Sequence, residues 1–252
     1  MLHAPTVEKL QALHLRGLVA AWEEQSRQTA YAELGFEERL GLLVDAEWTW
    51  RENRRQAQRL KAARLQCAAC VEDIDYRQPR GLDKSVLRSL ATCQWIAGHQ
   101  NVICVGPTGT GKTFLACALA TQACRHGYTA RYYRAPRLFQ ELALARGDGS
   151  YRQLLAKLAR TELLVVDDWG LAPLTAPERQ DFLELLDDRH GSRATLLTSQ
   201  LPIVHWHECI GDPTLADAIC DRLVHNAHQL TLKGGSMRKT RAGLTPPVAC
   251  ER

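Results

Sequence analysis

The chain has 252 residues, of which 45% are hydrophobic and 24% charged, and its formal net charge is +4. These values are typical of a globular protein with one ordinary α/β domain and a smaller one, and they argue against wholesale disorder. The apolar runs are far shorter than a membrane span and the N-terminus lacks the pattern of a signal peptide, so we expect a cytoplasmic protein without membrane association.

The first part of the chain has helical periodicity. Apolar residues recur at helical intervals from Thr6 to Glu24 and again from Phe36 to Leu65, so each stretch is predicted to form one helix. The period ends at Asp73 to Gly81, where a proline and a glycine interrupt it. We therefore predict a small all-helical domain at residues 1–72, which would contact DNA or a partner protein, and a second domain at residues 73–252.

A cluster of arginines lies in the second predicted helix. Arg51, Arg55 and Arg59 are four residues apart and would share one side of that helix. Such a face is either a solvated surface or a site for nucleic acid or an acidic partner, and charge alone does not choose between the two.

Cysteines are odd in number and most lie in core-like segments, as expected for small buried hydrophobic residues in a reducing compartment. Cys67 and Cys70 have the spacing of a metal-binding pair. Because no second pair accompanies them, we favour an incidental feature of a helix over a zinc or redox site.

A phosphate-binding loop follows a predicted helix at Asp83 to Gly98. An apolar run at Val102 to Val105 breaks into a glycine-rich loop, and a helix is predicted from Lys112 to His126. The glycines allow positive φ angles and leave backbone N–H groups free to hold a polyphosphate at the helix N-terminus. Lys112 would reach the β- and γ-phosphates, and the Thr113 hydroxyl would ligate the accompanying magnesium. The complete motif G-x-x-x-x-G-K-T consists of Gly106, Pro107, Thr108, Gly109, Thr110, Gly111, Lys112 and Thr113.

The next elements alternate between strand and helix, which predicts a parallel sheet with crossover helices. Residues Tyr128 to Tyr133 are predicted to form a strand and Pro136 to Ala145 a helix. Arg131, Arg134 and Arg137 are interleaved with tyrosines here. This segment is a second candidate for nucleic-acid contacts, and the alternative is that the tyrosines belong to the core.

Two adjacent carboxylates end the next predicted strand, Leu163 to Trp169. A buried parallel strand delivers side chains to its C-terminal end, where ligands of open α/β sheets bind. Asp167 is placed to hold hydrated magnesium and Asp168 to polarise the attacking water. Turn residues are the alternative, but the complete phosphate loop upstream favours the catalytic assignment.

The rest of the chain completes the predicted sheet. A helix at Ala176 to Arg189 is followed by a buried strand at Ala194 to Ser199. The terminal residues Thr198, Ser199 and Gln200 would lie beside the γ-phosphate and could sense it. Another helix begins at Pro213, and His228 to Leu232 forms the last predicted strand.

Five motifs in this order resemble the IstB-like transposition helper ATPases, relatives of the DnaC helicase loader within the AAA+ class. The motifs are V-G-P-T-G-T-G-K-T, L-L-V-V-D-D-W-G, L-L-T-S-Q-L-P, I-C-D-R-L-V-H-N-A and G-G-S-M-R-K. The resemblance implies an α/β fold, an AAA+ P-loop NTPase with a parallel five-stranded sheet. It also implies hydrolysis of ATP with Mg²⁺ by copies of the chain assembled into a ring or spiral on DNA, with duplex DNA favoured, and the recruitment and stimulation of a transposase.

The resemblance also implies roles for single residues. Arg222 matches the arginine finger that reaches the ATP of a neighbouring subunit, Arg238 matches the second sensor arginine, and Ser199 falls at the first sensor position. Asp168 stands where most AAA+ proteins have glutamate, so turnover is expected to be slow. Only residues 239–252 follow Arg238, so the three-helix lid of AAA+ proteins is expected to be reduced or absent.

The alternatives to a transposition helper are a helicase loader and a metabolic kinase. A DnaC-like helicase loader would dock its N-terminal domain on a replicative helicase and would prefer single-stranded DNA. A metabolic P-loop kinase is disfavoured by the motifs around Arg222 and Arg238.

Overall fold

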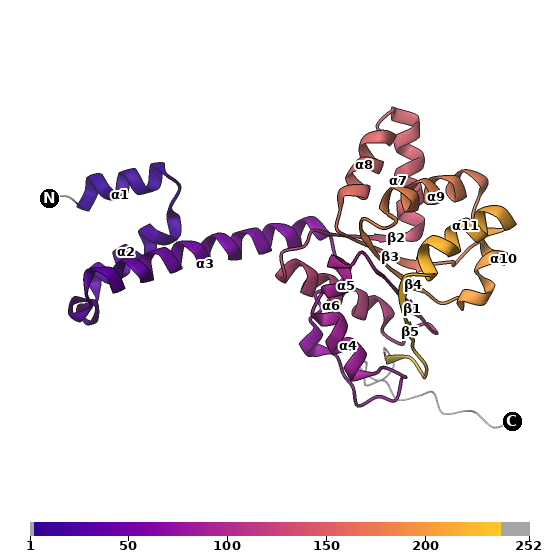
Figure 1. The fold of residues 1–252 in the computed structure, drawn as a ribbon, viewed down its shortest axis with the longest axis horizontal. Coiled ribbons are helices and arrows are strands. Elements are labelled where there is room, and N and C mark those ends of the chain that lie inside the picture. Colours follow the sequence, from indigo (N-terminus) through magenta and orange to yellow (C-terminus); the bar gives the residue numbers. More distant parts are fainter. Residues whose placement is uncertain (1–2, 238–252) are drawn as a thin grey trace, which may run out of the picture. The chain divides into compact units, whose positions relative to one another are not determined.

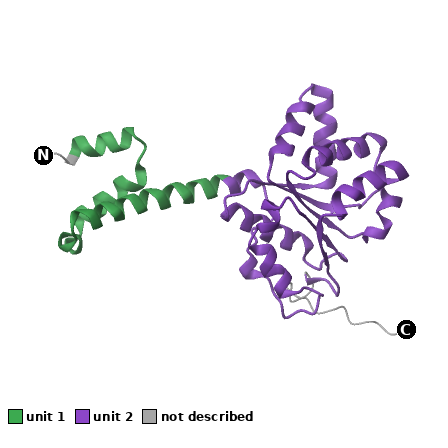
Figure 2. Ribbon diagram, viewed as in Figure 1, with its two compact units in different colours: residues 1–58 green, residues 59–252 purple. Residues whose placement is uncertain are grey.

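The computed structural model describes residues 3–237, which fall into two compact units (Figure 2). The first unit ends at Gln58 and the second begins at Arg59. The domain boundary predicted at 72/73 differs from this division because Ala63 and Ala69 are buried in the core of the second unit. The assignment of partner contacts to residues 1–72 stays a prediction. No helix within the described range is both long and apolar enough to cross a bilayer.

The first unit is built from helices (Figure 1). Helix α2 packs closely on α3 at Gly17, which has no side chain to separate the two helices. A Cβ added to Gly17 would lie only 2.8 Å from the Ala46 carbonyl oxygen. The Leu18 N–H also donates to the Glu47 carboxylate at 3.0 Å. The elements are α1 (His3–Ala12), α2 (Arg16–Arg27), a 3-10 turn η1 (Thr29–Glu33) and α3 (Phe36–Ala63), whose last residues belong to the second unit.

The single helix predicted over Thr6 to Glu24 is wrong, because the chain forms α1 and α2 there. His14 adopts a left-handed backbone conformation with φ +58° between them. A non-glycine residue in that conformation ends a right-handed helix. By contrast, the helix predicted over Phe36 to Leu65 is confirmed by α3.

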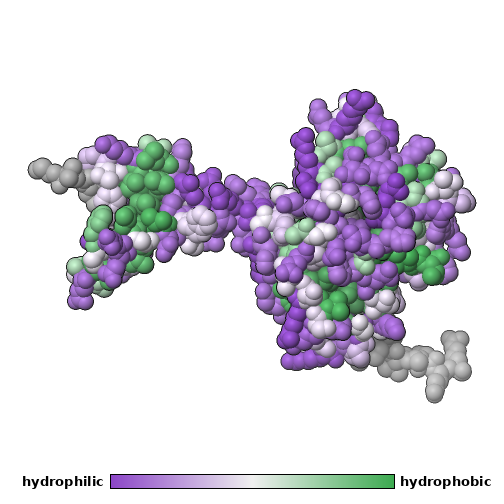
Figure 3. Space-filling model, viewed as in Figure 1, coloured by the Kyte–Doolittle hydropathy of each residue, from purple (hydrophilic) through white to green (hydrophobic). Residues whose placement is uncertain are grey.

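An apolar surface lies on the first unit, where Figure 3 shows hydrophobic side chains gathered together. Phe36, Leu40, Val44 and Trp48 of α3 are four residues apart and exposed, with Phe36 at 79% and Trp48 at 67%. A spacing of four places side chains on neighbouring turns of one helix face. Exposed patches of this kind commonly mark interaction sites.

A parallel five-stranded sheet forms the centre of the second unit, as expected. The strand order is β2-β3-β4-β1-β5, and every neighbouring pair is parallel. The carboxyl ends of all the strands therefore lie at the same edge of the sheet, where ligands bind. The strands are β1 (Asn101–Val105), β2 (Ala130–Arg134), β3 (Leu163–Trp169), β4 (Ala194–Ser199) and β5 (Ala227–Thr231).

Helices cover both faces of this sheet, and a core fills each interface (Figure 1). Side chains alternate along the strands, so Val102 and Cys104 enter one core while Ile103 and Val105 enter the other. The helices against the first core are α4 (Lys84–Ala91), α5 (Gln94–Ala97) and α6 (Lys112–Arg125). Those against the second are α7 (Ala135–Asp148), α8 (Tyr151–Arg160), α9 (Ala176–Arg189), α10 (Trp206–Ile210) and α11 (Pro213–Val224).

Two predictions for the second unit are corrected. The helix expected over Asp83 to Gly98 is divided into α4 and α5 by Cys93, which has φ +59°. Asp83 caps α4, since its carboxylate accepts from the Ser85 N–H at 2.7 Å. Helix α8, between β2 and β3, was not predicted.

Candidate functional site

The phosphate loop joins the end of β1 to the start of α6. Lys112 is buried, and its Nζ donates to the carbonyl oxygens of Gly106 at 2.7 Å and Pro107 at 2.8 Å. Gly109 has φ +82°, and a side chain there would collide with Ser236. The loop thus curls at the N-terminus of α6 and carries the ammonium group that can exchange its carbonyl partners for phosphate oxygens.

Three hydroxyl groups surround the carboxylate of Asp167, which is only 2% exposed. It accepts from Thr113 Oγ1 at 2.9 Å, from the Tyr132 hydroxyl at 2.6 Å, and from the Thr198 hydroxyl. Burial and the neighbouring carboxylate raise the pKa of Tyr132, so its hydroxyl stays protonated and keeps donating. The Asp167 carboxylate is therefore held rigidly beside the phosphate loop.

This arrangement fits a magnesium ion. The oxygen atoms of Thr113 and Asp167 lie side by side, and a hydroxyl with a carboxylate is a donor set that Mg²⁺ takes beside nucleotide phosphates. Mg²⁺ held by these two residues would neutralise charge on the phosphate oxygens.

Asp168 occupies a bulge in β3. The pairing of β3 with β4 shifts between Val166 and Trp169, and Asp168 has φ +58°. A non-glycine residue in this conformation costs on the order of 1–3 kcal/mol, so the surrounding structure must enforce it. Thr198 Oγ1 accepts from the Asp168 N–H at 3.1 Å, and Trp169 is buried and stacked on Phe182 at 4.5 Å between ring centroids. With Trp169 anchored in the core, the Asp168 side chain lines the cavity beside the phosphate loop.

Arg134, at the end of β2, holds the carboxylate of Asp168. Its Nε and Nη2 donate to Asp168 Oδ2 at 3.0 and 2.8 Å. This ion pair raises the pKa of Arg134. A residue predicted to contact nucleic acid therefore contacts the residue predicted to polarise the attacking water.

A cavity of about 320 Å³ opens next to the loop. Five residues of the predicted loop line it together with Asp168. Most of the other lining residues come from residues 64–83, the segment between α3 and α4 that is called the linker below. The rest come from α6 and from the chain after β4 and β5. Gln200, which was predicted to lie beside the γ-phosphate, is one of them. The lining residues not predicted to form the site are Gln66, Cys67, Asp73, Asp75, Arg80, Phe114 and Met237.

Ser199 does not line this cavity, although it was predicted to sense the γ-phosphate. It is fully buried, its hydroxyl donates to the Trp169 carbonyl at 2.8 Å, and the same oxygen accepts from the Leu201 N–H at 3.0 Å. The next residue, Gln200, is exposed and lines the cavity. Gln200 is therefore the polar side chain of β4's end that is positioned to meet a phosphate.

Arg222, on α11, also lies outside the cavity lining. It forms an ion pair with Asp187, and its Nη1 donates to the Ala218 carbonyl at 2.8 Å. Its predicted role concerns the site of another copy of the chain, and that role stays a prediction. Arg238 lies outside the described residues.

The other arginines predicted to contact DNA occupy different environments. Arg51 and Arg55 pair with Glu47 and Glu52 on the same helix. The remaining three donate to the backbone or are exposed: Arg59 donates to Cys124 O at 2.9 Å, Arg131 donates to Ala62 O at 2.9 Å, and Arg137 is exposed. Nucleic-acid contact through these side chains stays a prediction.

Cys67 and Cys70 follow the end of α3 and are not part of a helix, contrary to expectation. Cys67 lines the cavity, and Cys70 Sγ accepts from Arg125 Nη2 at 3.2 Å. In the described part of the chain, no group of three or more histidine, cysteine or acidic residues has the arrangement of a metal site.

Comparison with known proteins gives consistent results. The model of a family described as IstB-like ATP binding protein matches residues 8–244. A Sinorhizobium fredii protein, y4pL, named as an insertion sequence ATP-binding protein, is 49% identical over 239 residues, covering 95% of this chain and 98% of the relative. The IS21 ATP-binding protein of Pseudomonas aeruginosa is 34% identical over 247 residues, covering 95% and 93%.

A solved structure supports the fold. The DnaC helicase loader superposes with a TM-score of 0.57 at 16% identity, covering 66% of this chain and 97% of that one. At this identity the likeness concerns the fold.

Proposed function

The chain belongs to the IstB-like ATP-binding protein family and is an ATPase of the AAA+ class, and from that premise we propose that it assembles on duplex DNA with ATP bound and recruits and stimulates a transposase. Relatives along nearly its whole length are named for insertion sequences, which supports a role in transposition. In this proposal, Thr113 and Asp167 hold Mg²⁺, and copies of the chain form a ring or spiral in which Arg222 serves the neighbouring ATP.

Arg134 carries the proposed coupling between DNA and hydrolysis. It is half exposed, and it lies in the segment predicted to meet nucleic acid while it holds the Asp168 carboxylate. An arginine binds a phosphate with the same fork of donors that it offers a carboxylate. A DNA phosphate that engages Arg134 would release Asp168 to accept a proton from the attacking water.

The proposed function is tested by assembly and by transposition. With duplex DNA and a non-hydrolysable ATP analogue, the protein is expected to form DNA-bound oligomers in electron micrographs, and with ATP it should stimulate the cognate transposase in a strand-transfer assay. Preference for single-stranded DNA together with capture of a replicative helicase would instead identify a helicase loader. Monomers that transfer phosphate to a small molecule would contradict both functions.

Replacing Arg134 by alanine is expected to raise ATP hydrolysis without DNA and to reduce its stimulation by DNA. The reason is that the Asp168 carboxylate loses the partner that holds it. Steady-state ATPase rates with and without duplex DNA measure both effects. Arg137→Ala removes a charge from the same segment without touching this ion pair and is the control for the rate measured without DNA. A lower rate without DNA in the Arg134 variant would show that the pair orients Asp168 for catalysis rather than restraining it.

Arg222 is expected to act between subunits, which a mixing experiment can detect. Arg222→Ala keeps its own phosphate loop and Asp168, whereas Asp168→Asn keeps Arg222. In an equal mixture, roughly a quarter of the interfaces in a head-to-tail ring combine both intact groups. The two variants are mixed first, and ATP and DNA are then added. ATP hydrolysis should reappear in this mixture, and each variant alone at doubled concentration is the control. If no activity returns, Arg222 does not complete a neighbour's site.

A further inference from the structure

Arg80 lies in the linker between α3 and α4, and its side chain contacts the phosphate loop. It is 7% exposed, which is unusual for an arginine. Its Nη1 donates to the Thr110 carbonyl at 3.0 Å and its Nη2 donates to the Asp75 carbonyl at 2.9 Å. One guanidinium group thus joins the loop to the linker, and Arg80 also lines the cavity.

The contact with Thr110 determines how the next peptide group is turned. In a planar trans peptide, the C=O and the N–H point in opposite directions. Arg80 holds the Thr110 carbonyl, so the Gly111 N–H points away from Arg80. Gly111 has φ +95°, and an added Cβ would lie 2.7 Å from Arg80 Nη1. The close approach of the guanidinium and the orientation of this loop amide therefore depend on each other.

The chain after β5 supports the same arrangement. The Lys233 N–H donates to the Arg80 carbonyl at 2.8 Å, and the Met237 N–H donates to the Gly109 carbonyl at 2.8 Å. The backbone of Arg80 is thereby fixed from one side while its side chain holds the loop from the other. This leaves the guanidinium little freedom to move away from Thr110.

We infer that Arg80 is a positioning residue for the triphosphate of ATP, which holds the Gly111 N–H in its phosphate-binding orientation and ties the linker to nucleotide occupancy. The peptide group that donates to the phosphate is already held through its carbonyl oxygen before the phosphate binds. Binding therefore costs less conformational entropy. The fixed positive charge also favours the polyphosphate. The inference rests on the ATPase activity alone and is independent of the proposed DNA and transposase partners.

The test compares Arg80→Met and Arg80→Lys with the wild-type chain. We expect Arg80→Met to weaken ATP and ADP binding by ~10-fold or more, the effect of losing one or two hydrogen bonds to a charged group. Arg80→Lys should stay impaired, because a single ammonium group cannot hold both carbonyls with the geometry of a fork. Isothermal titration with each nucleotide gives the affinities. The ATPase should show a raised KM with kcat nearly unchanged, since Arg80 holds the backbone of the loop whereas Asp168 is held by Arg134.

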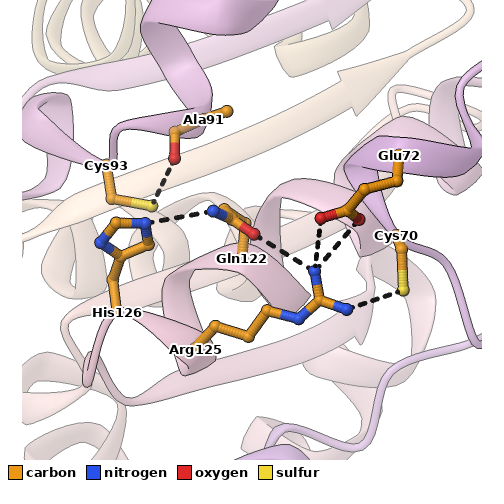
Figure 4. A network of polar contacts seen from close by, with 7 residues as sticks. All are labelled: Cys70, Glu72, Ala91, Cys93, Gln122, Arg125 and His126. Atoms are coloured by element: carbon orange, nitrogen blue, oxygen red, sulfur yellow. Dashed lines mark hydrogen bonds and ion pairs between the residues drawn. The ribbon is translucent and has the colours of Figure 1, made fainter.

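Arg125→Met is the matched control, and Figure 4 shows the contacts that Arg125 makes. Arg125 also joins α6 to the linker, through Glu72 at 2.9 Å and Cys70, but it does not reach the phosphate loop. This variant should bind ATP like the wild type. A purely structural role for Arg80 would lower the melting temperature of Arg80→Met and leave its ATP affinity unchanged at temperatures where it is folded. Wild-type affinity in Arg80→Met or Arg80→Lys, or an equal loss in Arg125→Met, would overturn the inference.

Discussion

Lys112→Ala is expected to abolish ATP binding and, with it, ATP-dependent assembly on DNA. The Lys112 ammonium group lies inside the curl of the phosphate loop, bonded to two loop carbonyls. In the bound state it would instead form charge-assisted hydrogen bonds to the β- and γ-phosphates. Two such bonds contribute about 3 kcal/mol or more, so affinity should fall by ~100-fold or more.

Binding of a fluorescent ATP analogue and sedimentation with duplex DNA measure the two effects of this substitution. Lys157→Ala removes an exposed lysine of α8 and should behave like the wild type in both assays. Assembly of Lys112→Ala on DNA at full strength would show that the oligomer does not depend on bound ATP.

Asp168→Asn is expected to block hydrolysis while leaving ATP binding intact. The side chain lines the cavity beside the loop, and the bulge in β3 holds it there. An amide of the same shape cannot accept a proton at neutral pH, and removal of a general base costs typically 10²- to 10⁴-fold, so kcat should fall by ~100-fold or more. Complexes with DNA should persist, because hydrolysis is the step proposed to release them.

Single-turnover hydrolysis and the lifetime of DNA complexes in a competition assay measure these effects. Asp188→Asn changes an exposed carboxylate on α9 and is the control. Turnover at the wild-type rate in Asp168→Asn would identify another residue as the base.

Much of the second unit was predictable because its elements are marked locally. The ranges predicted for β3, α9 and β4 agree with the structure, since buried β-branched runs and a helical period with proline in the first turn are each contained in one segment. His14 and Cys93 were missed because they break helices by adopting positive φ, without the glycine or proline that usually indicates a break.

The phosphate loop and the acids of β3 were predictable for the same reason. Each group of residues is contiguous, and its chemistry follows from residue type and from its position at the end of a strand. The sequence by itself predicted that a nucleotide polyphosphate binds between Lys112 and Asp168, and the resemblance of five ordered motifs predicted the family, which the comparisons confirm.

Only the tertiary structure decided which side chains contact the phosphate loop and the acids of β3. Arg134 meets Asp168 because β2 and β3 are parallel neighbours whose ends lie in register, with Arg134 opposite Asp167. Ser199 turns into the core, and Gln200 lines the cavity, because the bulge at Asp168 brings the Trp169 carbonyl within reach of the Ser199 hydroxyl. Arg80 reaches Thr110 across 30 positions of the chain. A hydrogen bond between such distant segments depends on how the sheet and the linker pack, and a local pattern of residues contains no record of that packing.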